Sequence, residues 1–309
     1  MVAEPNTVTR SSKSWSVSGK VFLLGEYAVL AGAPALVAAV PPRFSLSTRP
    51  SSGAIETVFH PESPAGRLLR ELRVQVPHFF SDPARGAGGF GASTAQFILA
   101  AAAHGISDWK VLWEKYRALH LAQDGVPPSG ADLVGQVVGG VVEFLPSEIP
   151  GEAPELVQRQ ASLSSISIAV IQASSQPGRK TATHSHLAKV SPDMLDRLRE
   201  KLEKTLDQGL RAFTEGDAAA FASTLGLYAE TLSQFDLEIP AARLDREALS
   251  KFPGVMGCKG TGALQSDALI AVVDSEQLDL RAFREFLEAR GLALWCPRLE
   301  SEDGLRESS

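Results

Sequence analysis

A glycine-rich stretch followed at once by hydroxyl residues and an apolar run is the part of this chain best suited to hold a phosphate. It runs from Gly89 to Leu99, and Gly88 precedes it. Glycines let the backbone turn tightly and approach a ligand, and the first turn of a helix offers unpaired N–H groups with partial positive charge. Together they form an anion site. The same residues also fit an ordinary loop in which Ser93 or Thr94 caps a helix.

A second polar stretch lies near the start of the chain, at both ends of a short apolar run. Lys20 stands directly before the run 21–24, and Gly25–Glu26–Tyr27 follows it. The run is typical of a buried strand. A rigid strand would therefore hold polar groups at each of its ends.

A carboxylate follows a sharp turn in the middle of the chain. Asp132 comes just after Ser129–Gly130, where proline, serine and glycine predict a tight loop. An aspartate in this position can cap the helix that follows or serve as a catalytic carboxylate. A further glycine loop, 257–267, runs into an apolar strand over 268–273.

Composition narrows the class of protein. The chain has 309 residues, 44% hydrophobic and 21% charged, which is enough for a full core in one large or two ordinary domains. The net charge of -6 argues against a nucleic-acid partner. Cys258 and Cys296 form no disulfide or metal pattern, which favours a reducing cytoplasm. Residues 1–14 lack a signal peptide's apolar core, and the run 28–40 is too short to span a bilayer.

The elements that must position these residues alternate without a regular βαβ rhythm, which predicts an α+β fold. The sequence becomes polar and proline-containing near residue 146, which predicts two domains, 1–160 and 161–309. The tail from Ser301 is expected to be loose. Strands are expected over 15–17, 21–24, 35–40, 44–48, 55–59, 141–145, 166–171, 268–273 and 292–296. Helices are expected over 67–74, 97–103, 109–121, 194–209, 217–233 and 278–291, with one more after Thr183.

Three stretches in a fixed order resemble the motifs of the GHMP kinases, the family of galactokinase, homoserine kinase, mevalonate kinase and phosphomevalonate kinase. They are Ser18-Gly-Lys with Gly-Glu-Tyr-Ala-Val, then Gly89-Phe-Gly-Ala-Ser-Thr-Ala, then Lys259-Gly-Thr-Gly-Ala. The resemblance covers most of the chain. It implies a two-lobed fold, with a ribosomal-protein-S5-like ATP-binding lobe over 1–160 and a ferredoxin-like lobe over 161–309.

The resemblance also implies roles for single residues, with ATP and Mg²⁺ as cofactors. Ser93 falls on a serine that helps to hold Mg²⁺, Lys20 on a lysine near the reacting hydroxyl, and Asp132 on the catalytic aspartate. Lys20 would keep the Asp132 carboxylate charged if the two lie close together. The remaining residues of the matched ATP site are Gly88, Gly89, Gly91, Ala92 and Thr94.

The acceptor implied by the resemblance is (R)-5-phosphomevalonate, an intermediate of isoprenoid precursor synthesis. The motif Gly25–Glu26–Tyr27 is similar to the corresponding motif of phosphomevalonate kinases. The chain is short for that branch, however, so mevalonate stays an alternative acceptor. A phosphorylated acceptor needs cationic groups, and Arg179, Lys180 and Lys259 are the candidates. The expected substrate contacts are Glu26, Tyr27, Ser129, Gly130, Lys180, Lys259 and Gly262.

Two departures from the family pattern leave a non-catalytic GHMP-fold ligand-binding protein as an alternative. Ala92 replaces the first serine of the phosphate loop, and Gly262-Ala-Leu-Gln-Ser stands where the family has Gly-Ala-Gly-Gly-Gly. Leu264 and Gln265 carry side chains where glycines would let a ligand approach the backbone. The sequence does not fix the oligomeric state, and a homodimer is one possibility.

Overall fold

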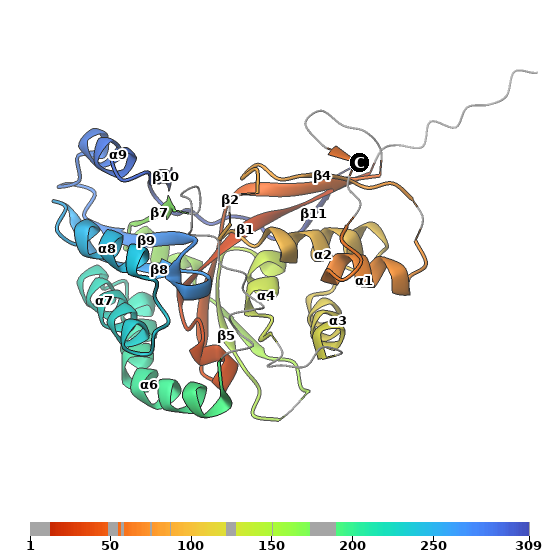
Figure 1. Cartoon of the computed structure of the whole chain (residues 1–309), viewed down its shortest axis with the longest axis horizontal. Coiled ribbons are helices and arrows are strands. Elements are labelled where there is room, and N and C mark those ends of the chain that lie inside the picture. Colours follow the sequence, from red (N-terminus) through yellow and green to blue (C-terminus); the bar gives the residue numbers. More distant parts are fainter. Residues whose placement is uncertain are drawn as a thin grey trace, which may run out of the picture.

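Two antiparallel sheets with helices packed around them form the molecule (Figure 1). The computed structural model describes residues 13–48, 55–56, 59–74, 76–86, 88–121, 128–149, 151–173 and 190–308. Thr183 and the helix expected after it lie outside these ranges, as do Arg179 and Lys180. Within them, no helix is both long and apolar enough to cross a membrane.

The first sheet is built on two long strands, β1 and β2, which pair antiparallel with an irregularity between Ser18 and Gly19. Within the described ranges its order is β11-β1-β2-β4-β3, with β5 pairing with both β2 and β6. The strands are β1 Ser14–Leu24, β2 Ala35–Ser47, β3 Ile55–Glu56, β4 Phe79–Ser81, β5 Val141–Leu145, β6 Glu155–Gln158 and β11 Arg306–Ser308.

The second sheet has the order β10-β7-β9-β8. Its strands are β7 Ile168–Gln172, β8 Val255–Thr261, β9 Ala268–Val273 and β10 Ala293–Cys296. The segment 257–261, expected to be part of a loop, is therefore the end of strand β8, because its backbone pairs with β9 from Cys258 to Thr261.

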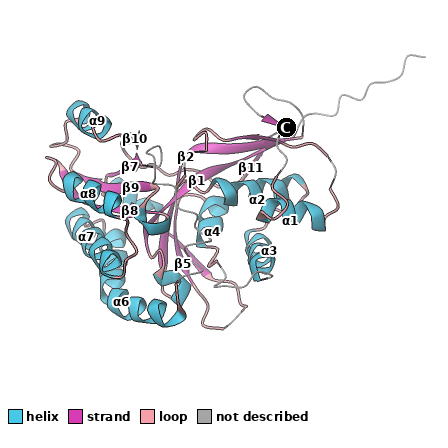
Figure 2. Cartoon of the chain, in the orientation of Figure 1, coloured by secondary structure: helices cyan, strands magenta, loops and turns pink. Residues whose placement is uncertain are grey.

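Helices gather in two groups around the sheets (Figure 2). The first group, beside β1 and β2, consists of α1 Pro64–Glu71, α2 Ala92–Ala103, α3 Trp109–Leu121 and α4 Ala131–Val138. The second consists of α6 Pro192–Glu215, α7 Ala218–Gln234, α8 Pro240–Leu249 and α9 Leu280–Glu288. The described residues also include three short 3-10 turns: η1 Ala28–Ala31, η2 Gln160–Ser164 and η3 Ala263–Gln265. Helix α8 was not predicted from the sequence, because it is short and starts at Pro240 without a capping side chain.

Capping residues explain where α6 begins and ends. Ser191 accepts a hydrogen bond from Met194 N at the start of α6, and Pro192 occupies the first turn. Gly216 ends the same helix in the left-handed conformation.

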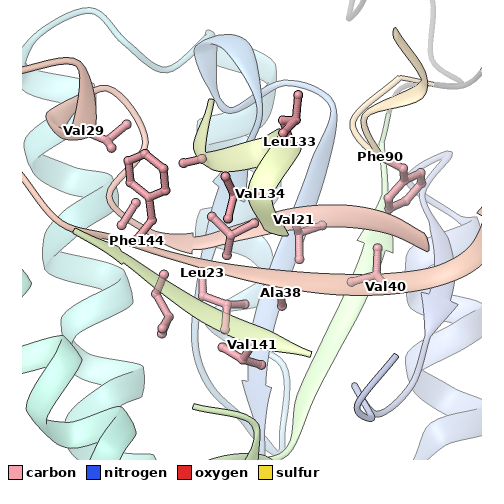
Figure 3. Close-up of a cluster of buried hydrophobic side chains, with 14 of the residues drawn as sticks. Val21, Leu23, Val29, Ala38, Val40, Phe90, Leu133, Val134, Val141 and Phe144 are labelled. Carbon is pink, nitrogen blue, oxygen red and sulfur yellow. The ribbon is translucent and has the colours of Figure 1, made fainter. Parts of the chain in front are cut away.

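The core beneath the candidate site lies between the first sheet and α4. Val21 and Leu23 of β1 are fully buried, and so are Leu133 and Val134 of α4 (Figure 3). Phe90, in the glycine loop before α2, is 1% exposed. The elements that carry the polar residues of interest are thus fixed by shared apolar burial.

The C-terminal tail is ordered, contrary to the expectation that it is loose. Strand β11 pairs with β1. Arg43 of β2 donates hydrogen bonds to the carbonyl oxygens of Asp303 and Gly304, both at 2.6 Å. Backbone pairing and a guanidinium that satisfies carbonyl groups hold a segment that is polar in sequence.

Candidate active site

The start of α2 presents N–H groups that the protein leaves unused. Gly91 caps the helix in the left-handed conformation and offers no side-chain cap. The first helical hydrogen bond runs from Ala95 N to Gly91 O at 2.8 Å. Among the described residues, the N–H groups of Ala92, Ser93 and Thr94 have no acceptor. Free donors at a helix N-terminus suit the oxygens of a phosphate.

Glycine is required in the loop because neighbouring groups approach its backbone. A Cβ at Gly91 would lie 3.0 Å from Gln136 Oε1 and 3.2 Å from Lys20 Cε. One at Gly89 would lie 2.9 Å from the Cβ of Asp267. Both glycines also have positive φ, which other residues adopt with strain. The loop is therefore a tight cradle lined by an ammonium group, an amide and a carboxylate.

Phe90 anchors the loop to both sheets. Its carbonyl oxygen accepts a hydrogen bond from Lys20 N at 3.1 Å. Its ring stacks on Trp295 of β10, with centroids 4.8 Å apart and planes 21° from parallel. These two contacts hold the loop against β1 and β10.

Asp132 lies at the start of α4 and is joined directly to the loop helix. Thr94 Oγ1 donates a hydrogen bond to Asp132 Oδ2 at 3.0 Å, and Leu133 N donates to Oδ1 at 2.9 Å. Gly130 is the N-cap of α4 and Asp132 lies inside its first turn, so the expectation that Asp132 caps this helix is wrong. The bond from Thr94 instead links the Asp132 carboxylate to the phosphate loop.

A buried tyrosine lies beside this link. Burial, followed by the charge of Asp132, raises the pKa of the Tyr116 hydroxyl on α3, and an interaction with Thr94 opposes that shift. Tyr116 is therefore a buried neighbour of both Thr94 and Asp132.

Lys20 and Asp132, which were expected to lie close together, contact the same loop without bonding to each other. Among the described residues no ion pair joins them, and the Asp132 carboxylate accepts a hydrogen bond from Thr94. Lys20 is 8% exposed, and its Nζ lies 5.2 Å from the centroid of the Phe22 ring. The two side chains meet the same loop from different elements, Lys20 beside Gly91 and Asp132 through Thr94.

Glu26 and Lys259, both expected to contact the acceptor, form a buried ion pair with each other. Lys259 is fully buried, and its Nζ also donates to Gly260 O at 2.8 Å. Gln265 Nε2 donates to Glu26 Oε1 at 2.9 Å. Burial lowers the pKa of Lys259, and the charge of Glu26 opposes that shift. This network joins the end of β1 to β8 and η3, so its first role is to hold the two sheets together.

Tyr27 belongs to the same junction. It is 6% exposed, and its hydroxyl accepts a hydrogen bond from Leu264 N at 2.6 Å. Burial raises the pKa of this hydroxyl. Leu264 and Gln265 both have positive φ, so side chains occupy a backbone conformation in which glycine is more common. Tyr27 therefore fixes an unusual loop in place.

Ser129 and Gly130 pack against Trp113. Trp113 Nε1 donates to Ser129 O at 2.8 Å, and a Cβ at Gly130 would lie 2.5 Å from Trp113 Cδ1. They shape the turn that aims Asp132. Gly262 is half-buried, and a Cβ there would meet Asp267 Oδ2 at 2.5 Å. Lys180, the remaining expected contact, lies outside the described residues.

The residues present suit a nucleotide with its metal ion. The side chain of Ser93 is exposed at the first turn of α2, beside the free N–H groups. Among the described residues, no three His, Cys, Asp or Glu side chains gather as a metal site. Mg²⁺ at phosphate sites commonly takes most of its ligands from phosphates and water, so one hydroxyl fits the protein's share.

Three residues of the site were missed in the sequence. Gln136 is fully buried, donates to Ser18 O at 2.7 Å, and leaves its Oε1 without a partner beside Gly91. Its spacing of four from Asp132 places it on the same helix face. Asp267, directly before a buried strand, was included only as part of a loop. The sequence does not single out Tyr116 as a site residue, because it occupies one of the apolar positions at helical spacing in α3.

No protein-family model and no curated protein sequence matches this chain. Solved structures do match it. Lactococcus lactis galactokinase complexed with galactose has a TM-score of 0.71 at 13% identity, covering 96% of this chain and 95% of that one. Streptococcus pneumoniae phosphomevalonate kinase in complex with phosphomevalonate and AMPPNP has a TM-score of 0.68 at 15% identity, covering 94% and 99%. Methanococcus jannaschii mevalonate kinase has a TM-score of 0.68 at 15% identity, covering 94% and 100%. The chain therefore has the two-lobed α+β fold of the GHMP kinases.

Proposed function

We propose that this protein is an ATP-dependent small-molecule kinase that transfers the γ-phosphoryl group of ATP to (R)-5-phosphomevalonate. The observation that carries the proposal is the hydrogen bond from Thr94 to Asp132. It holds a carboxylate one short side chain away from a helix N-terminus whose N–H groups are free. The kinases that share the fold support the same reading.

Phosphoryl transfer depends on positioning and on a field that stabilises spreading negative charge. The N–H groups of Ala92, Ser93 and Thr94 would hold phosphate oxygens, and the Ser93 hydroxyl would contribute to Mg²⁺, which neutralises charge on them. Lys20 adds positive charge beside Gly91. Asp132 orients the attacking oxygen and accepts its proton where one is present. We assign ATP binding to a domain of residues 1–160 and the closing loop to a domain of residues 161–309.

Mevalonate is the second candidate acceptor, and one observation favours it. A phosphorylated acceptor needs cations, but Lys259, one of the three considered, is fully buried and paired with Glu26. Arg179 and Lys180 lie outside the described residues. The case for phosphomevalonate is the Gly25–Glu26–Tyr27 motif together with the structural neighbour that binds phosphomevalonate.

A coupled assay of ADP release, with ATP, Mg²⁺ and each acceptor in turn, tests the proposal. Turnover with phosphomevalonate above that with mevalonate or galactose is the expected result. Turnover with mevalonate alone would replace the acceptor and keep the kinase. Nucleotide binding without turnover on any of the three would instead favour a non-catalytic ligand-binding protein.

A further inference from the structure

The side chain of Asp267 lies against the phosphate loop. The Cβ of Asp267 is 2.9 Å from the position that a Cβ of Gly89 would occupy, so only glycine lets the two segments meet. Asp267 Oδ2 is 2.5 Å from the position that a Cβ of Gly262 would occupy. The carboxylate is held between the loop of the first sheet and the loop that leads into β9.

Asp267 is half-buried. Burial raises the pKa of its carboxyl, and the charge of Lys20 and a hydrogen bond with Ser266 offset only part of that rise. Its backbone oxygen accepts from Ala173 N at 3.1 Å, which fixes the segment on the second sheet. Asp267 and Lys20 thus flank the loop with opposite charges, in a region partly screened from water.

A carboxylate at this place acts differently on the two forms of a nucleotide. A triphosphate without its metal carries several negative charges, and a nearby carboxylate repels it more strongly than in bulk water. A divalent cation on the phosphates removes that repulsion and gives the carboxylate an attractive partner. We propose that Asp267 makes this site selective for metal-complexed nucleotide over free nucleotide. The inference rests on the proposed function.

Calorimetric titration with AMPPNP, once with Mg²⁺ and once with EDTA, tests this. The measured quantity is the dissociation constant of metal-free AMPPNP divided by that of the Mg²⁺–AMPPNP complex. This ratio is determined for wild type, Asp267→Asn and Asp207→Asn. Asp207 is an exposed carboxylate on α6 and serves as the matched control. We expect the ratio to fall about tenfold or more in Asp267→Asn, from the loss of one unit charge near the phosphates, and to stay unchanged in Asp207→Asn.

Each outcome has a defined meaning. Tighter binding of free nucleotide by Asp267→Asn indicates repulsion, and weaker binding of the Mg²⁺ complex indicates contact with the metal; both lower the ratio and support the inference. A ratio within about twofold of wild type, in a variant with the wild-type melting temperature, overturns it. A wild type that binds neither form overturns the proposed function instead. If Asp267→Asn does not fold, Asp267→Ser, with a smaller neutral side chain beside Gly262, takes its place.

Discussion

Thr94 Oγ1 lies 3.0 Å from Asp132 Oδ2 and donates a hydrogen bond to it, although the two residues are 38 positions apart in the chain. This bond joins the first turn of α2, which carries free N–H groups, to the first turn of α4, which carries the carboxylate. Two helix N-termini therefore point positive dipole ends at the same small region. Negative charge introduced there, or developing there, is stabilised by both.

Replacing Asp132 with asparagine removes the charge and keeps the shape. Because a positioned base contributes about 10²–10⁴-fold to a rate, kcat in the ADP-release assay should fall within that range. Nucleotide affinity, measured by calorimetry, should change little, since the N–H groups of α2 remain. Asp207→Asn, on the exposed face of α6, should leave both quantities unchanged. An Asp132→Asn enzyme with wild-type kcat would remove Asp132 from the mechanism.

Thr94→Val keeps the volume of the side chain but removes the hydrogen-bond donor to Asp132. Hydrogen bonds to charged groups are worth about 1.5–3 kcal/mol, so kcat should drop by about tenfold or more. The ADP-release assay measures this drop.

Thr94→Ser is the matched control, because it keeps the hydroxyl. It should retain most of the activity in the same assay. A Thr94→Val enzyme with the wild-type kcat would show that the hydrogen bond to Asp132 does not contribute to the rate.

The sequence predicted the local parts of the site and missed the contacts between distant segments. The glycine loop before α2, Lys20 on β1 and Asp132 after a turn all follow from short-range patterns. The expected link between Lys20 and Asp132 is replaced by Thr94, because only the folded packing of α2 on α4 decides which side chains touch. The pairing of Glu26 with Lys259 crosses 233 positions, and no local pattern distinguishes it from two ligand contacts.

The loop preceding α2 offers a direct test of the cradle. In Gly91→Ala the new Cβ would meet Gln136 Oε1 and Lys20 Cε, and the backbone φ of 81° would be strained. Strain of this kind is worth about 1–3 kcal/mol, and displacement of the loop should weaken AMPPNP binding by at least about tenfold. Gly105→Ala is the control, because Gly105 has a φ of 82° and open space around it. It should lose stability in urea unfolding but keep its nucleotide affinity.

Breaking the Glu26–Lys259 pair should destabilise the fold. Lys259→Met leaves the Glu26 carboxylate buried, with a hydrogen bond from Gln265 but without its cation. Removing one partner of a buried pair typically lowers the free energy of unfolding by about 3–5 kcal/mol, which denaturant titration will measure. The double variant Glu26→Gln, Lys259→Met removes both charges and should recover part of the loss. If Lys259→Met is as stable as wild type yet binds acceptor poorly, Lys259 contacts the acceptor as first expected.

Stability at mildly acidic pH should depend on a histidine pair at the edge of the first sheet. His78 Nε2 and His104 Nε2 are 3.3 Å apart, at the end of α2 opposite the phosphate loop. Burial lowers the pKa of both below 6.5, and for His78 the charge of His104 lowers it further. As pH falls below 6.5, the unfolded chain takes up protons before the folded one. The stability present above that pH is therefore lost as pH falls through the pKa values of the folded state.

Urea unfolding at pH 7.5 and 5.5, values about one unit either side of the ordinary histidine pKa, measures this effect. The loss of unfolding free energy between the two pH values should be smaller in His104→Gln than in wild type. His60→Gln, at an exposed histidine outside the pair, should show the wild-type loss, and an equal loss in all three proteins would exclude the pair as its source.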